Sequence, residues 1–173
     1  MKKTIFITGG CKSGKSRHAI ELSEEISTIK RIFIATCSPL DDEMKERIDR
    51  HKQERDKSWQ TVEAPIELSI EINKNDGNGG VILIDCLTLW INNLLMENKN
   101  PDIINQHIEK LICTIQETKS PIILVSNEVG TGIVPENKLA RQFRDLAGLT
   151  NQKIAECADS VIWMVAGIPI TIK

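Results

Sequence analysis

The sequence predicts an α/β fold in which helices cover both faces of a doubly wound, mostly parallel sheet. Short apolar runs recur along the chain, and most are continuous stretches of Val, Ile and Leu, as in strands that are buried on both faces. Longer segments of helical character separate these runs, and such alternation implies right-handed βαβ units. The chain has 173 residues, and we expect residues 1–173 to form one domain without an internal boundary.

The predicted strands are apolar runs of four to seven residues at 4–8, 31–36, 81–85, 122–126 and 160–166. A last apolar piece, residues 168–172, follows Gly167 directly, and too little chain lies between it and the preceding run for a crossover connection. We therefore expect this piece to return antiparallel as an edge strand, where Pro169 is tolerated.

The predicted helices occupy the segments between the strands, at residues 15–27, 40–56, 65–73, 87–98, 102–119 and 136–157. Residues 73–80 consist of Asn, Lys, Asp and Gly, and this composition predicts a loop. The sequence shows no repeat and no low-complexity tract.

Composition and charge exclude several classes of protein. A formal charge of −2, a pI near 6.0 and the scarcity of aromatic residues argue against a nucleic-acid binder. No apolar run approaches the length of a membrane span, and the N-terminal run is too short for a signal peptide. The five cysteines, an odd number without a Cys-x-x-Cys pair, indicate a reducing compartment, so we expect a cytoplasmic protein.

A glycine-rich phosphate loop stands between the first predicted strand and the first predicted helix. Its glycines let several backbone N–H groups point at one phosphate, and the N-terminus of the following helix adds positive potential. The lysine can reach the outer phosphates and the final serine can bind Mg²⁺. A glycine turn that binds nothing is the alternative, but the flanking strand and helix are the context that the motif requires. The sequence therefore predicts a triphosphate site at Gly9, Gly10, Cys11, Lys12, Ser13, Gly14, Lys15 and Ser16.

A carboxylate ends the predicted strand at residues 81–85. Asp85 stands where the second metal ligand of a phosphate-loop protein is expected, so Ser16 and Asp85 are the candidate Mg²⁺ ligands. Many strands end in Asp because this residue favours turns, so the position of Asp85 alone is a weak signal. The phosphate loop earlier in the chain is what favours a role in metal binding.

The segment 41–57 is charged at every position except Met44, Ile48, His51 and Gln53. On a helix, His51 falls on the same narrow stripe as the two apolar residues. A solvated helix with His51 at the margin of a thin apolar stripe is one interpretation, which the pattern alone favours. The other is a functional imidazole that acts as a general base or as a nucleophile on phosphorus.

Two further features stand apart from the phosphate loop. Residues 127–137 follow a predicted strand at the carboxyl edge of the sheet and are suited to cover a substrate. The next helix carries Arg141 and Arg144, which could meet an anionic phosphate or pair with acids across a subunit contact. His18 and His107 are expected to make local or structural contacts only.

A series of segments in the same order along nearly the whole chain resembles one family, the bifunctional adenosylcobinamide kinase/adenosylcobinamide-phosphate guanylyltransferases of cobalamin synthesis. These segments are residues 9–19, 34–36, 40–44, 47–48 and 51–52, then Trp59, Thr61 and Glu63, then 127–137, 139–141, 143–145 and 151–152.

The resemblance implies two reactions. A nucleoside triphosphate, ATP or GTP, phosphorylates the aminopropanol hydroxyl of adenosylcobinamide, and GTP then transfers GMP to adenosylcobinamide-phosphate with release of pyrophosphate. In this family GMP is carried on a histidine, and the matching position is His51. The resemblance also implies a homotrimer. It assigns as GTP contacts the phosphate loop together with Thr36, Cys37, Ser38, His51, Lys52, Gln53, Glu54, Glu63 and Asp85.

The chain departs from the family pattern in small ways. Relatives often have two adjacent histidines where this chain has Arg50 and His51, and they often have Glu at position 85 and a small residue at position 11. Two rival interpretations remain: a plain small-molecule kinase with a structural His51, and a GTP-binding module without catalysis.

Overall fold

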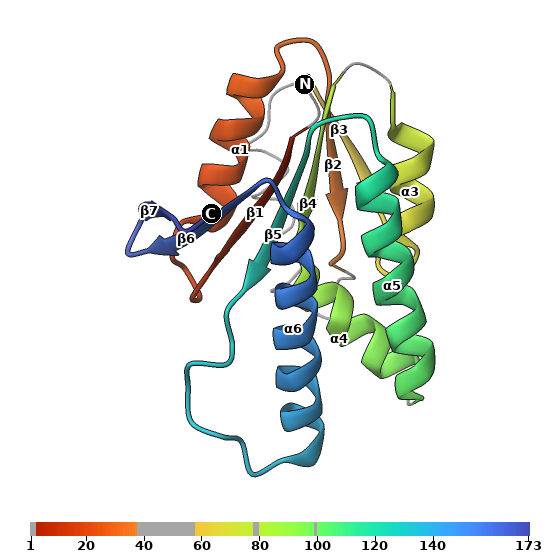
Figure 1. Cartoon of the computed structure of the whole chain (residues 1–173), viewed down its shortest axis with the longest axis vertical. Helices are drawn as coiled ribbons and strands as arrows, with labels where there is room; N and C mark the ends of the chain where they lie inside the picture. The colour runs from red at the N-terminus through yellow and green to blue at the C-terminus, as the bar shows by residue number, and fades with distance from the viewer. Residues whose placement is uncertain (1–2, 38–57, 78–79, 99) are drawn as a thin grey trace.

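The computed structural model describes residues 3–37, 58–77, 80–98 and 100–173. Its strands are β1 (Thr4–Gly9), β2 (Arg31–Ala35), β3 (Trp59–Glu63), β4 (Val81–Asp85), β5 (Ile122–Asn127), β6 (Ser160–Val165) and β7 (Ile168–Thr171). Its helices are α1 (Lys15–Ile26), α3 (Leu68–Asn75), α4 (Leu87–Glu97), α5 (Pro101–Glu117) and α6 (Lys138–Cys157). Strands and helices alternate along most of the chain, as expected (Figure 1).

The strands form one seven-stranded sheet with the order β3-β2-β4-β5-β1-β6-β7. The pairings from β3 to β6 are parallel, and β7 pairs with β6 antiparallel. The predicted parallel sheet and antiparallel edge strand are confirmed. Because the strands are parallel, β1, β4 and β5 end at one edge, with Gly9 opposite Asn127 and Asp85 opposite Val125.

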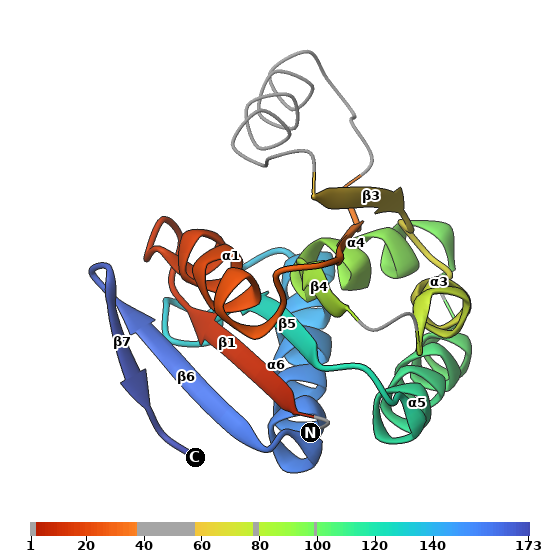
Figure 2. The same cartoon turned by 90° about the horizontal axis from the view of Figure 1, so that it is seen from above.

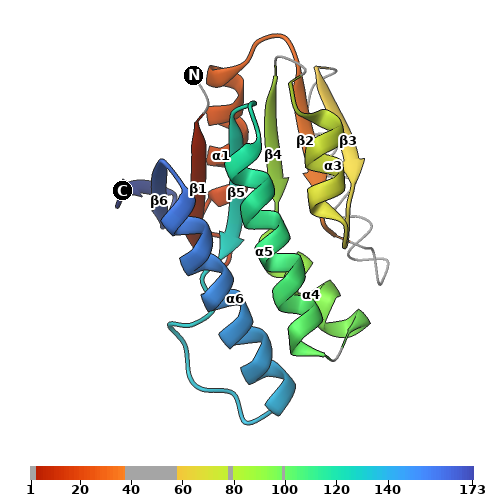
Figure 3. The ribbon, with the colours of Figure 1, turned by 45° about the vertical axis from the view of Figure 1, so that its right-hand side comes forward.

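Helices cover both faces of the sheet (Figure 2). On one face, α1 packs on a cluster of buried side chains from β1, β4 and β5 that includes Ile7, Leu83 and Val125. On the opposite face, α3, α4, α5 and α6 enclose a larger cluster that includes Phe6, Leu124 and the fully buried Trp90. Figure 3 shows α5 and α6 crossing this second face.

Side-chain caps explain where two of the helices begin. The Asn100 side chain accepts a hydrogen bond from the Asp102 N–H at 3.0 Å, and Pro101 stands in the first turn of α5. The Asn137 side chain accepts one from the Ala140 N–H at 3.2 Å, so α6 begins at Lys138, two residues after the predicted start.

Strand β3 is the element that the sequence analysis missed. It lies at the edge of the sheet beside β2, and none of its five residues is fully buried. An exposed edge strand has no need of a continuous apolar run, so it lacks the signal that identified the other parallel strands. The predicted helix at residues 40–56 lies outside the described residues. No helix in the described ranges is long and apolar enough to cross a membrane.

Candidate functional site

The phosphate loop joins the end of β1 to the start of α1. Ser13 N–H donates to the Gly10 carbonyl at 3.3 Å, which closes a tight turn. Lys12 and Gly14 have positive φ angles of 53° and 95°, so the loop backbone is left-handed at two positions, as in loops whose N–H groups converge on an anion. Gly14, at the N-cap of α1, offers no side chain to the first N–H groups, and the first turn holds no acid. These groups are therefore available to an anion.

Lys15 is only 6% exposed as a residue, and its ammonium lies against this loop. Its Nζ donates to the Gly10 carbonyl at 2.6 Å and contacts Ser13 Oγ at 3.4 Å. Burial lowers the pKa of Lys15 from its ordinary value, and the nearby Asp85 carboxylate partly opposes that effect. Lys15 and Asp85 thus lie close enough to influence each other electrostatically, and their shared role in binding phosphates and metal stays a prediction.

The turn after Asp85 is held by Thr36, which follows β2. Thr36 Oγ1 donates to the Cys86 carbonyl at 2.8 Å and accepts from the Cys86 N–H at 2.9 Å. Thr36 is fully buried, and its own carbonyl accepts from Asn93 Nδ2 at 2.8 Å. The hydroxyl therefore fixes the backbone that carries Asp85, and the predicted contact between Thr36 and a nucleotide stays a prediction.

A second chain of polar contacts crosses the carboxyl edge of the sheet. Asn127 Nδ2, at the end of β5, donates to Thr88 Oγ1 at 2.9 Å, and Thr88 Oγ1 lies 3.1 Å from Cys86 Sγ. Burial, and then the Asp85 carboxylate, raise the pKa of the Cys86 thiol to about 11, so the sulfur stays protonated near neutrality. Asn151 of α6 donates to the Asn127 carbonyl at 3.2 Å. The sequence analysis did not predict this series of hydrogen bonds, although Asn127 stands at a strand end.

The turn between β6 and β7 supports the phosphate loop from its other side. Gly167 N–H donates to the Ser13 carbonyl at 3.0 Å, and a Cβ on Gly14 would lie 3.3 Å from the Gly167 Cα. Gly9, at φ +152°, rests against the Met164 carbonyl, and a Cβ at Gly9 would collide with that oxygen. This contact explains why glycine begins the loop.

We therefore expect opposite effects from alanine at two glycines. Gly9→Ala should destabilise the fold by about 1–3 kcal/mol, because its φ angle is strained for other residues and the Met164 backbone cannot yield easily. Gly148→Ala in the middle of α6 should stabilise it by about 0.5–1 kcal/mol, since an added Cβ meets nothing within 4 Å there. Thermal unfolding of the two variants measures both; a Gly9→Ala variant as stable as the parent would contradict the close approach.

Some of the other predicted site residues lie in the described part of the chain, and the rest lie outside it. Glu63 ends β3 opposite Ala35, and the half-buried Cys37 follows β2, so both lie at the carboxyl edge. Cys11 is exposed in the loop and Ser16 lies in the first turn of α1. Predictions for the remaining residues fall outside the described part of the chain: Ser38, His51, Lys52, Gln53 and Glu54.

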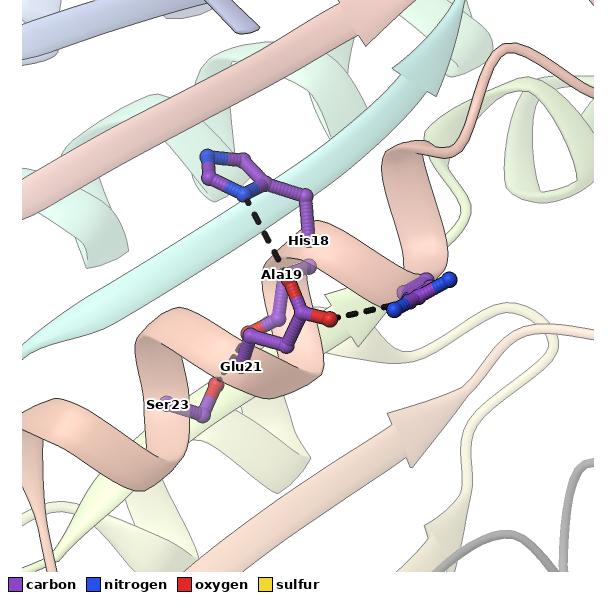
Figure 4. A network of polar contacts seen from close by, with 5 residues as sticks. His18, Ala19, Glu21 and Ser23 are labelled. Atoms are coloured by element: carbon purple, nitrogen blue, oxygen red, sulfur yellow. Dashed lines mark hydrogen bonds and ion pairs between the residues drawn. The ribbon is translucent and has the colours of Figure 1, made fainter. Parts of the chain in front are cut away.

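His18 makes a local contact on α1, as the sequence analysis expected. Its Nδ1 lies 3.9 Å from Glu21 Oε2, and on the same helix Ser23 Oγ donates to the Ala19 carbonyl at 2.7 Å (Figure 4). Glu21 also accepts from Arg17 at 2.9 Å. All the contacts of this network lie within one helix.

The two arginines of α6 have different surroundings. Arg141 Nη1 donates to the carbonyls of Pro135 and Glu136, at 3.0 and 2.6 Å, and so holds the end of the loop at residues 128–137. Arg144 Nε lies 3.9 Å from the exposed Asp145 carboxylate. A cavity of about 480 Å³ lies nearby, lined by Leu95, Met96, Pro101, Ile104, Asn105, Leu139, Gln142, Asp145, Leu146 and Leu149.

A phosphate loop after the first strand of a parallel sheet, with a buried lysine and a carboxylate on a nearby strand, defines a nucleotide-binding protein of the P-loop class. A family model described as cobinamide kinase / cobinamide phosphate guanyltransferase matches residues 5–172. The chain belongs to this family.

Curated relatives are similar over nearly their whole length. CobU of Escherichia coli (strain K12), a bifunctional adenosylcobalamin biosynthesis protein, is 42% identical over 181 residues, covering 98% of this chain and 99% of that protein. CobP of Pseudomonas aeruginosa, described in the same words, is 41% identical over 168 residues, covering 97% and 96%. The crystal structure of the flagellar accessory protein FlaH from Methanocaldococcus jannaschii has a TM-score of 0.53 at 13% identity, over 99% of this chain and 78% of FlaH, and thus shares the fold alone.

Proposed function

We propose that this protein phosphorylates adenosylcobinamide with ATP or GTP and then transfers GMP from GTP to adenosylcobinamide-phosphate. Membership of the cobinamide kinase / cobinamide phosphate guanyltransferase family over residues 5–172 carries the proposal. The relatives named above are described as bifunctional, which supports two reactions in one chain. The chain acts as one domain, and it works in the cytoplasm.

In the kinase reaction, the substrate hydroxyl attacks the γ-phosphorus and the nucleoside diphosphate leaves. The phosphate loop binds the phosphates through its backbone N–H groups, and Lys15 neutralises charge on the outer phosphates. Because Lys15 is nearly buried, it acts in a medium where its charge is poorly screened by water.

Ser16 and Asp85 are suited to bind Mg²⁺ together with the phosphates. A hydroxyl in the first turn of α1 and a carboxylate at the end of β4 are hard oxygen ligands, and Asp85 lies close enough to Lys15 to affect its pKa. Bound Mg²⁺ would neutralise charge on the β- and γ-phosphates.

Asp85→Asn should therefore reduce both activities by about 10²–10³-fold, because the amide loses the negative charge that binds the metal. The fold should persist, since the Thr36 hydroxyl binds the Cys86 backbone rather than the carboxylate. Raising the Mg²⁺ concentration should recover part of the activity. Normal turnover of the purified variant at low Mg²⁺ would remove Asp85 from the metal site.

In the guanylyltransferase reaction, we propose that the His51 imidazole attacks the α-phosphorus of GTP and pyrophosphate leaves. The phosphate of adenosylcobinamide-phosphate then attacks the phosphorus of the GMP on His51, and the imidazole leaves. A covalent carrier divides one difficult transfer into two displacements. Cys37, Ser38, Lys52, Gln53, Glu54 and Glu63 are proposed as further contacts for GTP.

The decisive experiment incubates the protein with [α-³²P]GTP and tests whether label survives denaturation. We expect retained label that is discharged by adenosylcobinamide-phosphate. A plain kinase would retain none but would phosphorylate adenosylcobinamide, and a GTP-binding module would do neither.

We also propose that the protein is a homotrimer. Besides the family resemblance, an exposed apolar face on the β6–β7 hairpin supports self-association. Trp163 pairs with Ile170 and Val165 with Ile168, and all four side chains are more than 40% exposed on one face of the hairpin. Such a face typically marks an interaction site.

Sedimentation at micromolar concentration should give about three times the chain mass of 19.4 kDa. Ile170→Asp should shift the protein toward the monomer, because a charge on the hairpin face would have to be desolvated in the interface. Ile29→Asp, at an apolar residue that is 84% exposed outside the hairpin, serves as the control. A monomeric parent protein would contradict the assembly.

A further inference from the structure

In the described part of the chain, three buried polar atoms that lack a hydrogen-bond partner lie close to the start of the phosphate loop. The buried side-chain atoms of this kind are Thr8 Oγ1, Trp59 Nε1, Ser126 Oγ and Asn151 Oδ1. Trp59 begins the edge strand β3, but the other three belong to β1, β5 and α6, and β1 contacts both β5 and α6. Most buried polar groups have a partner, so three such oxygens in neighbouring elements indicate a bound molecule.

The two hydroxyls of this cluster lie side by side on one face of the sheet. Thr8 and Ser126 are partners in the register of β1 and β5, and adjacent strands are about 4.8 Å apart. Phe6 and Leu124, two residues earlier on each strand, belong to the cluster that α3, α4, α5 and α6 enclose. Because side chains alternate along a strand, both hydroxyls point toward these helices.

The amide of Asn151 brings the third oxygen to the same place. Helix α6 crosses this face of the sheet, and Asn151 is only 8% exposed (Figure 3). Its Nδ2 donates to the Asn127 carbonyl at 3.2 Å, and Asn127 follows Ser126 directly in β5. Since Oδ1 and Nδ2 belong to one planar amide, Oδ1 lies at the same end of β5 as the Ser126 hydroxyl.

The chemistry of the three oxygens determines which ligand they suit. An amide oxygen only accepts hydrogen bonds, whereas each hydroxyl can donate one and accept others. The ligand must therefore donate to Asn151 and can exchange either kind of bond with Thr8 and Ser126, as a water molecule does. A hard cation fits less well, because it takes six or more oxygen ligands, usually with carboxylates among them, and these three oxygens are neutral.

We propose that one water molecule is bound inside the protein by Thr8 Oγ1, Ser126 Oγ and Asn151 Oδ1. It joins β1, which leads into the phosphate loop, to α6, which follows the loop at residues 128–137. It also orients the Asn151 amide, whose other end holds the last residue of β5. This water belongs to the folded protein and does not depend on the proposed reactions.

A high-resolution crystal structure of the full-length protein tests the site directly. We expect a density peak at hydrogen-bonding distance, about 2.7–3.2 Å, from all three oxygens. A site without density would overturn the proposal. Anomalous signal at the peak after crystals are soaked in rubidium chloride would also overturn it, because the ligand would then be a monovalent cation.

The sign of a stability change provides a second test. Thr8→Val replaces the hydroxyl by a methyl group, and Ser126→Ala removes the other hydroxyl. If the water is bound, each variant deprives it of one partner, and the melting temperature should fall by about 1–6 °C. If the three oxygens had no ligand, Thr8→Val should instead raise the melting temperature, because an apolar group would replace a buried hydroxyl that binds nothing.

Thr114→Val is the matched control for the exchange of threonine for valine. Thr114 is buried on α5, and its hydroxyl donates to the Lys110 carbonyl at 2.8 Å, far along the chain from the three oxygens. This variant should change the melting temperature little, because the acceptor belongs to the helix backbone. A rise in melting temperature in Thr8→Val or in Ser126→Ala would overturn the bound water.

Discussion

His51→Ala should retain no covalent label from [α-³²P]GTP and should lose guanylyl transfer, on the order of 10⁶-fold, as expected when a covalent nucleophile is removed. Kinase activity should survive at a reduced level, because transfer of the γ-phosphoryl group needs no intermediate on histidine. In the parent protein, the bond to GMP should be a phosphoramidate, labile in acid and stable in alkali, since protonation makes imidazole a good leaving group.

The other two histidines are the controls for this result. His18→Ala and His107→Ala should label like the parent protein; His18 contacts Glu21 within its own helix, and His107 lies on α5. Labelling should also decline as the pH falls below about 6.5, the ordinary pKa of histidine, because only the neutral imidazole can attack. If His51→Ala labels as strongly as the parent protein, another residue carries GMP or the label is not covalent.

Lys15→Ala should abolish both reactions while leaving the fold intact. We expect a loss of about 10²–10³-fold in turnover or more, because the ammonium is a preorganised cation in a poorly hydrated loop. Stability should change little, since the variant loses two contacts within the loop but also removes a desolvated charge. Turnover assays and thermal unfolding on the same preparation measure the two effects.

Lys110→Ala is a suitable control for the loss of a lysine. Lys110 lies on α5 and is half-exposed, 3.7 Å from Glu67, and such a surface pair contributes little to stability. Its activity should equal that of the parent protein. Near-normal turnover in Lys15→Ala would show that the phosphate loop does not carry the chemistry.

The part of the fold that could be predicted from the sequence is the part whose strands are buried. β1, β2, β4 and β5 are almost entirely buried and read as apolar runs, and the short connection at Gly167 predicted the antiparallel β7. β3 was missed because Gln60 and Thr61 face solvent at the edge of the sheet. Burial, rather than strand formation itself, produces the pattern.

In the candidate site, the part that could be predicted from the sequence is the part whose residues are close together along the chain. The phosphate loop is local in sequence, so its spacing alone identified it. The hydrogen bonds of Thr36 with Cys86 and of Asn127 with Thr88 join residues 50 and 39 positions apart, and no local pattern predicts such pairs. His51 was assigned through the family resemblance, because its helical pattern alone favours a solvated surface.

The support that the β6–β7 turn gives to the phosphate loop determines when, during its synthesis, the protein can first bind a triphosphate. The loop, at residues 9–16, leaves the ribosome early. However, the Ser13 carbonyl accepts its hydrogen bond from Gly167, and Gly9 packs against the Met164 carbonyl, so both contacts form only after the C-terminal strands have been made. Strand β1 also lacks one of its two neighbours until β6 has been made. A nascent chain that ends before residue 160 therefore carries the nucleotide motif without its support, and triphosphate binding should begin only after translation has passed residue 167.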